Sequence, residues 1–107
     1  MIVKNENVNL EKLDDKVCRK ILGCDGSLMM VEVRFEKGGI GEIHSHEHEQ
    51  VSYIVEGSFE VTVGEEKEVL KTGDSFYVEA NVDHGVKALE DAVILDVFTP
   101  IREGFLE

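Results

Sequence analysis

The chain has 107 residues, 42% of them hydrophobic and 32% charged, which predicts one globular domain with its own core. A formal net charge of −12 would repel nucleic-acid phosphates and anionic membranes, so we expect neither as a partner. We also expect no signal peptide and no membrane span, and we interpret Cys18 and Cys24 as reduced thiols of a cytoplasmic protein.

Short runs of alternating apolar and polar residues, separated by glycine-bearing turns, predict an all-β domain. The runs are residues 28–35, 51–57, 58–64 and 92–98, with turns at 36–42, 64–67 and Gly73-Asp74. Two apolar faces are predicted, formed by Met29, Val31, Val33 and Phe35 in the first run and by Phe59, Val61 and Val63 in the third.

A helix signal appears only over residues 10–17, which is too short a segment to set the fold. We therefore predict a single domain over 1–107, with an N-terminal arm at about 1–16 and a β-barrel or sandwich at about 17–100.

The segment IHSHEHEQ (43–50) is the sharpest chemical signal in the chain. On an extended strand His44, His46 and Gln50 share one parity and point to the same side. Imidazoles two residues apart on a rigid strand are natural ligands of a transition metal. His84 is the only histidine outside this segment, and it follows a turn and a strand that can return beside the first. We predict that these four residues hold one divalent metal ion.

His48 has the same parity, but four ligands are already available without it. We therefore interpret His48 as a residue that lines the mouth of the site or supports a ligand, not as a ligand. Glu47 and Glu49 alternate with the histidines and are predicted to face solvent.

Residues 38–57 resemble the first sequence motif of the cupin family, in which a glycine, five intervening residues and HxH are followed by Glu, Gln or His. Residues 73–86 resemble the second motif, with Gly73 and His84 in register. Glu79 and Asn81 depart from it, because they stand where the motif usually has proline and glycine. Asparagine tolerates a left-handed backbone, so we expect the turn to survive. The resemblance implies a single-domain cupin, a jelly-roll barrel also called a double-stranded β-helix.

Gln50 has consequences for the chemistry, because many cupins carry glutamate at this position. Three neutral imidazoles and a neutral amide leave the full divalent charge of the metal uncompensated. We therefore expect the metal site to attract a small anionic substrate, which the acidic surface elsewhere would repel. The metal can be nickel, zinc, iron or manganese, because ligands of this kind do not select among them.

The last apolar run contains Asp96 in mid-strand, on the same parity as Ile94 and Phe98. A carboxylate among large apolar residues is disfavoured unless it has a hydrogen-bonding or charged partner or a functional role. Asp96 is either paired at the rim of the barrel or a general acid and base that faces the metal cavity. Arg102 is either a surface residue or a bidentate clamp on a substrate carboxylate.

The tail and the HSHEHEQ segment together resemble the KdgF-type pectin-degradation cupins, which have Asp, Phe and Arg at the positions of Asp96, Phe98 and Arg102. The resemblance implies an isomerase that opens the ring of 4,5-unsaturated monouronates from pectin and alginate breakdown to give linear 4-deoxy-5-keto uronates. It implies Asp96 as the catalytic residue and Arg102 and Phe98 as substrate-binding residues. A homodimer is the family expectation.

Three other readings stay open from the sequence. An iron-dependent cupin dioxygenase would use the same histidines, and a non-catalytic cupin would bind a small molecule without turnover. A purely structural metal would have a closed coordination shell, whereas a catalytic metal keeps an open position.

Overall fold

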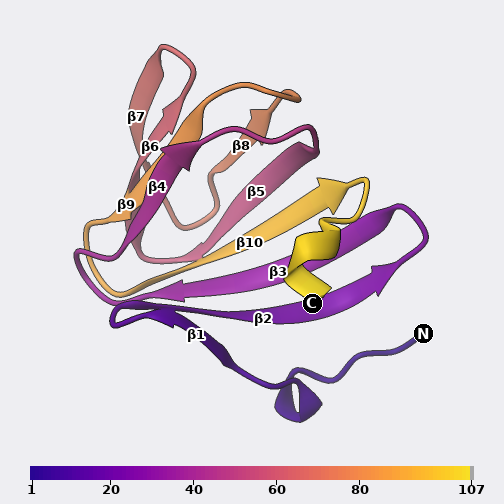
Figure 1. Ribbon diagram of the computed structural model, residues 1–107. Helices are drawn as coiled ribbons and strands as arrows, with labels where there is room; N and C mark the ends of the chain where they lie inside the picture. The colour runs from indigo at the N-terminus through magenta and orange to yellow at the C-terminus, as the bar shows by residue number, and fades with distance from the viewer. Residues whose placement is uncertain (107) are drawn as a thin grey trace.

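Two antiparallel sheets pack face to face in the computed structural model, which describes residues 1–106 (Figure 1). One sheet has six strands in the order β1-β2-β3-β10-β5-β8, with bounds Glu11–Asp14, Val17–Asp25, Leu28–Phe35, Ala92–Thr99, Glu49–Glu56 and Ser75–Val78. The other has four strands in the order β4-β9-β6-β7, with bounds Ile40–His44, His84–Ala88, Ser58–Val63 and Glu66–Lys71. Two short 3₁₀ helices, η1 (Asn5–Asn7) and η2 (Glu103–Leu106), lie near the ends of the chain. The all-β prediction is confirmed.

The predicted apolar faces form the interior of the sandwich. Met29, Val31, Phe59 and Val61 are buried, and the last run lies between β3 and β5 with its even-numbered residues facing inward. One core cluster is built around Phe35, Ile54, Phe59 and Ile94, and a smaller one consists of Met29, Val31 and Phe98. Alternation at period two therefore predicted correctly which side chains are buried.

Residues 10–17 contain no helix, so the weak helix signal was misleading there. Glu11–Asp14 forms β1, an exposed edge strand that pairs with β2. Eight residues are too few to stabilise an isolated helix, whereas pairing with β2 satisfies backbone groups at once.

The HxH segment is also not one continuous strand, contrary to the parity argument. β4 ends at His44, and His46 lies in the connection before β5 begins at Glu49. The β4–β9 register passes from Gly41↔Val86 to His44↔His84, so β4 has one residue more than its partner and forms a bulge. The bulge places His44 directly opposite His84. The histidines are therefore brought together because the end of β4 meets the start of β9, not because they lie on one straight strand.

Asn81 adopts a left-handed backbone with φ 67°, the only non-glycine residue to do so among those described. Its backbone N–H donates a hydrogen bond of 2.7 Å to the carbonyl of His46. The expectation that asparagine can replace the usual glycine here is confirmed, and the turn supports the loop that carries His46.

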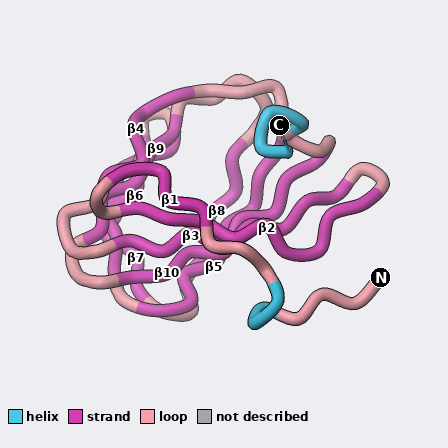
Figure 2. Tube along the Cα trace, turned by 60° about the horizontal axis from the view of Figure 1, so that its bottom comes forward, coloured by secondary structure: helices cyan, strands magenta, loops and turns pink. Residues whose placement is uncertain are grey.

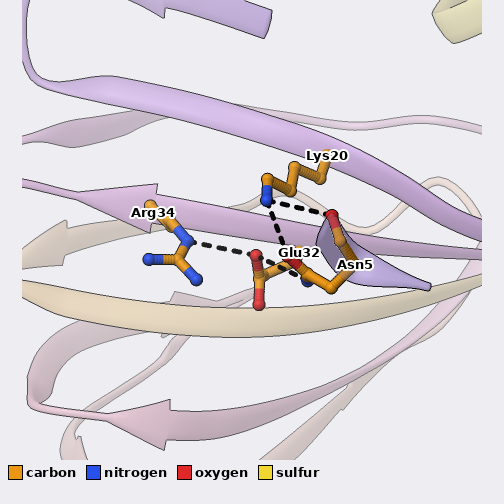
Figure 3. A network of polar contacts seen from close by, with 4 residues as sticks. All are labelled: Asn5, Lys20, Glu32 and Arg34. Atoms are coloured by element: carbon orange, nitrogen blue, oxygen red, sulfur yellow. Dashed lines mark hydrogen bonds and ion pairs between the residues drawn. The ribbon is translucent and has the colours of Figure 1, made fainter. Parts of the chain in front are cut away.

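The two ends of the chain lie against the six-stranded sheet. Asn5 of η1 contacts Lys20 and Glu32 on its outer face, and Arg34 pairs with Glu32 at 3.1 Å (Figure 3). At the other end of the chain, η2 turns back after β10 (Figures 1 and 2), and its Phe105 packs against Arg19 on β2 and against the cluster of Met29 and Val31 on β3. No helix among residues 1–106 is long and apolar enough to cross a membrane.

We predict that Gly57→Ala destabilises the fold by about 1–3 kcal/mol more than Gly73→Ala. Both glycines have positive φ, so alanine is strained at both positions. A Cβ atom at Gly57 would lie 2.6 Å from the carbonyl oxygen of Asp91, whereas nothing lies within 4 Å of one at Gly73. Urea unfolding of the two variants isolates this steric difference. Equal losses in the two variants would contradict it.

Candidate metal centre

Three histidines from separate parts of the chain converge at one end of the sandwich. His44 ends β4, His84 begins β9 and His46 lies in the loop before β5. Their nearest ligand atoms all lie within 4.8 Å of one another, and their rings are 4.5–5.4 Å apart between centroids. The structure therefore brings together the three histidines that the sequence singled out.

Each of the three rings is oriented by a backbone carbonyl two residues away. Nδ1 of His44 donates to Glu42 at 2.8 Å, Nδ1 of His46 to His48 at 2.9 Å and Nδ1 of His84 to Val82 at 2.9 Å. A carbonyl can only accept, so the Nδ1 atoms carry the protons. The Nε2 atoms are left with free lone pairs, which is the arrangement that outer hydrogen bonds impose on metal-binding histidines.

Gln50 completes a fourth side of this group. Its Oε1 lies 3.1 Å from Nε2 of His46, while its amide nitrogen donates to Ser52 Oγ at 2.8 Å and to Asp96 Oδ1 at 3.3 Å. Those two acceptors fix the amide, so the oxygen must face His46. Two lone pairs then face each other at hydrogen-bonding distance, and a cation between them would remove their repulsion.

The donor set fits a divalent transition metal. Nε2 of His84 is buried and has no hydrogen-bond partner within residues 1–106, which is costly unless something binds it. Burial lowers the pKa of both His46 and His84, and the charge of Arg102 lowers both further. Neutral imidazoles are the form that binds a metal. The three-histidine group can hold one metal ion, and the nature of the ion is not decided by these atoms.

A cavity of about 200 Å³ lies beside the histidines, inside the sandwich. Its polar wall includes His44, Gln50, His84, Asp96 and Arg102, and Phe98 lies against them. Arg19 and Asp14 also line it, and the rest of the wall is largely apolar, formed mainly by Val33, Phe35, Ile40, Phe76, Val86 and Ile94. All of the candidate residues other than His46 line this one cavity, and His46 packs edge-on against Phe98 with ring centroids 5.8 Å apart.

Asp96 faces inward between Ser52 on β5 and Val31 on β3. Ser52 donates a short hydrogen bond of 2.5 Å to its Oδ1. Burial raises the pKa of Asp96 to about 6, although the Ser52 hydrogen bond and the charge of Arg102 oppose the shift. Asp96 forms no ion pair with a lysine or arginine among residues 1–106, and its hydrogen-bond donors there are the Ser52 hydroxyl and the Gln50 amide.

Arg102 follows β10 and is half-buried against two aromatic rings. Its guanidinium carbon lies 4.2 Å from the ring centroid of Phe105 and 5.2 Å from that of Phe98. Burial lowers the pKa of Arg102, and the neighbouring Asp96 charge opposes that shift. Arg102 forms no ion pair with any carboxylate in the described part of the chain. Its donors are therefore available to a ligand in the cavity.

His48 lies outside the three-histidine group. Its backbone carbonyl accepts the hydrogen bond that orients His46, and its own ring centroid lies 5.5 Å from that of His46. Glu47 and Glu49 are both exposed as predicted, and Glu49 accepts a hydrogen bond from the hydroxyl of Tyr77.

Three residues of the site were missed from the sequence, namely Ser52, Arg19 and Phe105. Ser52 shares parity with Gln50, and Arg19 shares parity with Val17 and Ile21 on β2, so each is a polar residue on an inward face. That parity could have revealed both. Phe105 gives no periodic signal, because it lies in η2 beyond the last strand.

Comparison with known proteins agrees with this geometry. The cupin domain family matches residues 31–98, which include every histidine of the group. The pectin degradation protein KdgF of Dickeya dadantii is 47% identical over 98 residues, which cover 90% of this chain and 89% of that protein. The chain belongs to the cupin family and is of the KdgF type.

Two solved structures have the same fold over nearly the whole chain. KdgF from Halomonas sp. is 36% identical with a TM-score of 0.94, and the match covers 98% of this chain and 99% of that one. An RmlC-like cupin from Shewanella frigidimarina is 40% identical with a TM-score of 0.94, covering 97% and 94% of the two chains. The jelly-roll prediction is therefore confirmed.

We predict that the purified protein binds one divalent transition metal per chain and that a chelator lowers its melting temperature. A ligand that binds only the folded state stabilises it by mass action. His84→Ala should abolish most of this binding and make the melting temperature insensitive to chelator. Metal content by mass spectrometry and thermal melts test both points, and full metal occupancy in His84→Ala would contradict the assignment. Lys71→Ala, an exposed substitution on β7 outside the residues that line the cavity, serves as the control.

Proposed function

We propose that this cupin opens the ring of 4,5-unsaturated monouronates and yields linear 4-deoxy-5-keto uronates. The observation that carries the proposal is that Asp96 and Arg102 line the same cavity as His44, Gln50 and His84. The similarity to the KdgF proteins, one of which is named for pectin degradation, supports a sugar-acid substrate.

The size of the cavity supports a monosaccharide. About 200 Å³ is less than the roughly 300–1,000 Å³ of pockets that enclose drug-sized ligands. The mixed wall also suits a uronate, which has a charged carboxylate at one end and an apolar ring face. An oligosaccharide would need a longer groove.

In this proposal His44, His46, His84 and Gln50 hold the metal. When bound, the metal supplies positive charge that attracts the substrate carboxylate and stabilises negative charge that develops on the ring oxygen. Because all four side chains are neutral, none of them offsets that charge. The site is thus cationic within a chain of net charge −12.

Asp96 moves the protons. As a carboxylate it accepts the proton of the hydroxyl on C1, so that C1 becomes an aldehyde and the C1–O5 bond breaks with its electron pair on O5. The resulting enolate over C4, C5 and O5 takes a proton on C4 from the acid form of Asp96, which leaves a ketone at C5 and restores the carboxylate. One proton is taken and one is returned, and no oxidant or reductant is needed.

Arg102 and Phe98 bind the substrate in this scheme. The unpaired guanidinium of Arg102 can form two parallel hydrogen bonds with the substrate carboxylate. Phe98 is almost fully buried at 2% exposure and offers its ring to the apolar face of the sugar. These contacts hold C1 and C4 within reach of one carboxylate.

We expect the metal-loaded protein to accelerate loss of absorbance from the conjugated double bond of unsaturated galacturonate, compared with the spontaneous reaction. Asp96→Asn should lower kcat by about 10²–10⁴-fold with unchanged metal content, because an amide cannot accept and return the proton. The exposed Lys71→Ala variant on β7 is the control.

No acceleration by the metal-loaded protein would refute the proposed function. Equal rates with and without oxygen are also expected, whereas a strict requirement for oxygen would favour the dioxygenase reading instead.

We infer a homodimer that forms through the outer face of the six-stranded sheet. Val51, Tyr53 and Val55 are 43–48% exposed on β5, and Tyr77 lies opposite Val51 on β8. This uncharged row lies on a strongly acidic protein, so a second copy can approach there with least repulsion.

Free Cys18 and Cys24 support a reducing compartment, and we propose that the protein is cytoplasmic.

We predict a solution mass of about twice the 12.0 kDa of one chain and a monomer for Tyr53→Glu. A glutamate there would place like charges opposite each other across a two-fold axis. Analytical ultracentrifugation measures both masses, and Lys67→Glu on the other sheet is the control. A monomeric wild type, or a dimeric Tyr53→Glu, would overturn this interface.

A further inference from the structure

Phe105 is the residue on which two arginines meet at the cavity. The guanidinium carbon of Arg19 lies 3.9 Å from the centroid of its ring and that of Arg102 lies 4.2 Å from it. The same ring packs edge-on against Phe98 with centroids 5.8 Å apart. All four residues line the cavity, so η2, which folds back over the sheet in Figure 1, contributes directly to the site.

Arg19 is a fixed member of this group. It faces inward on β2 opposite Val33, and its side chain is only 12% exposed. Its Nε and Nη2 atoms donate to the two carboxylate oxygens of Glu11 on β1 at 2.9 and 3.1 Å. This bidentate pair uses two of the donors of Arg19 and holds its guanidinium plane in place.

Arg102 differs from Arg19 in one essential respect, because it forms no ion pair among residues 1–106. Its position depends on the rings that it stacks against and on the backbone hydrogen bond from Phe105 N–H to its carbonyl at 2.9 Å. A long side chain without such contacts would sample many rotamers, and ordering it on binding would cost affinity.

We propose that Glu11, Arg19 and Phe105 are positioning residues that hold Arg102 ready for the substrate carboxylate. Contacts run from β1 through Glu11 and Arg19 to the ring of Phe105, and the ring places the guanidinium of Arg102. The energetic basis is the attraction of a cation to an aromatic face, which is stronger where water is partly excluded. This inference rests on the proposed role of Arg102 in the proposed function.

The test is equilibrium binding of D-galacturonate to the metal-loaded protein, followed by NMR titration. This saturated uronate has the carboxylate but lacks the C4–C5 double bond, so binding is measured without turnover. Phe105→Leu keeps apolar bulk and removes the aromatic face, and we expect it to weaken binding about 3- to 10-fold. Phe105→Tyr keeps the face and should stay within about twofold of the wild type. Metal content and circular dichroism should be unchanged in both.

A double-mutant cycle with Arg102→Gln separates positioning from simple closure of the cavity. If Phe105 acts through Arg102, Phe105→Leu should cause no further loss in the Arg102→Gln background. The same 3- to 10-fold loss there would show that the ring only covers the cavity and would overturn the proposal. Wild-type affinity in Phe105→Leu, or equal losses for Leu and Tyr, would overturn it as well.

Turnover distinguishes this proposal from the function on which it rests. With unsaturated galacturonate, Phe105→Leu should raise KM and leave kcat unchanged, because the proton transfers of Asp96 are not affected. A wild type that binds galacturonate with the expected cycle but does not open the unsaturated ring would refute the proposed function alone. A wild type that shows no galacturonate binding would refute the positioning role.

Discussion

The site depends on a row of inward-facing polar groups that crosses two paired strands. Gln50 and Ser52 lie on β5 and Asp96 lies opposite Ser52 on β10, so one antiparallel register brings all three together. Ser52 and Asp96 accept the amide protons of Gln50 and thereby turn its oxygen toward His46. Asp96, which would transfer protons, and Gln50, which would face the metal, are therefore held by the same hydrogen bonds. The position of either side chain depends on the other.

Burial of these polar groups is balanced by local charge. An isolated carboxylate inside a sandwich is costly, and the raised pKa of Asp96 reflects that cost. Arg102 and the Ser52 hydroxyl reduce it, while neutral imidazoles on the other wall leave room for an added positive ion. The molecule thus combines an acidic exterior with a cavity that favours an anion.

Sequence periodicity selected the side chains of the site more accurately than it predicted the strand bounds around them. Parity grouped Asp96 with Ile94 and Phe98, and in the structure all three line the cavity. Parity also selected His44 and His46, but for a wrong reason, because the strand ends at His44 and a bulge turns that residue toward His84. Local alternation cannot reveal a bulge, since the extra residue is defined only against the partner strand.

The sequence by itself determined the all-β class, the buried faces and the set of histidines, because these follow from alternation and residue chemistry along one stretch of chain. Tertiary structure alone decided that Arg102 has no ion-pair partner in the described chain while Arg19 is bound to Glu11. It also decided that Phe105 lies between these arginines and Phe98. The physical reason is that these contacts join β1, β2 and the tail, which are far apart in sequence and meet only when the sandwich closes.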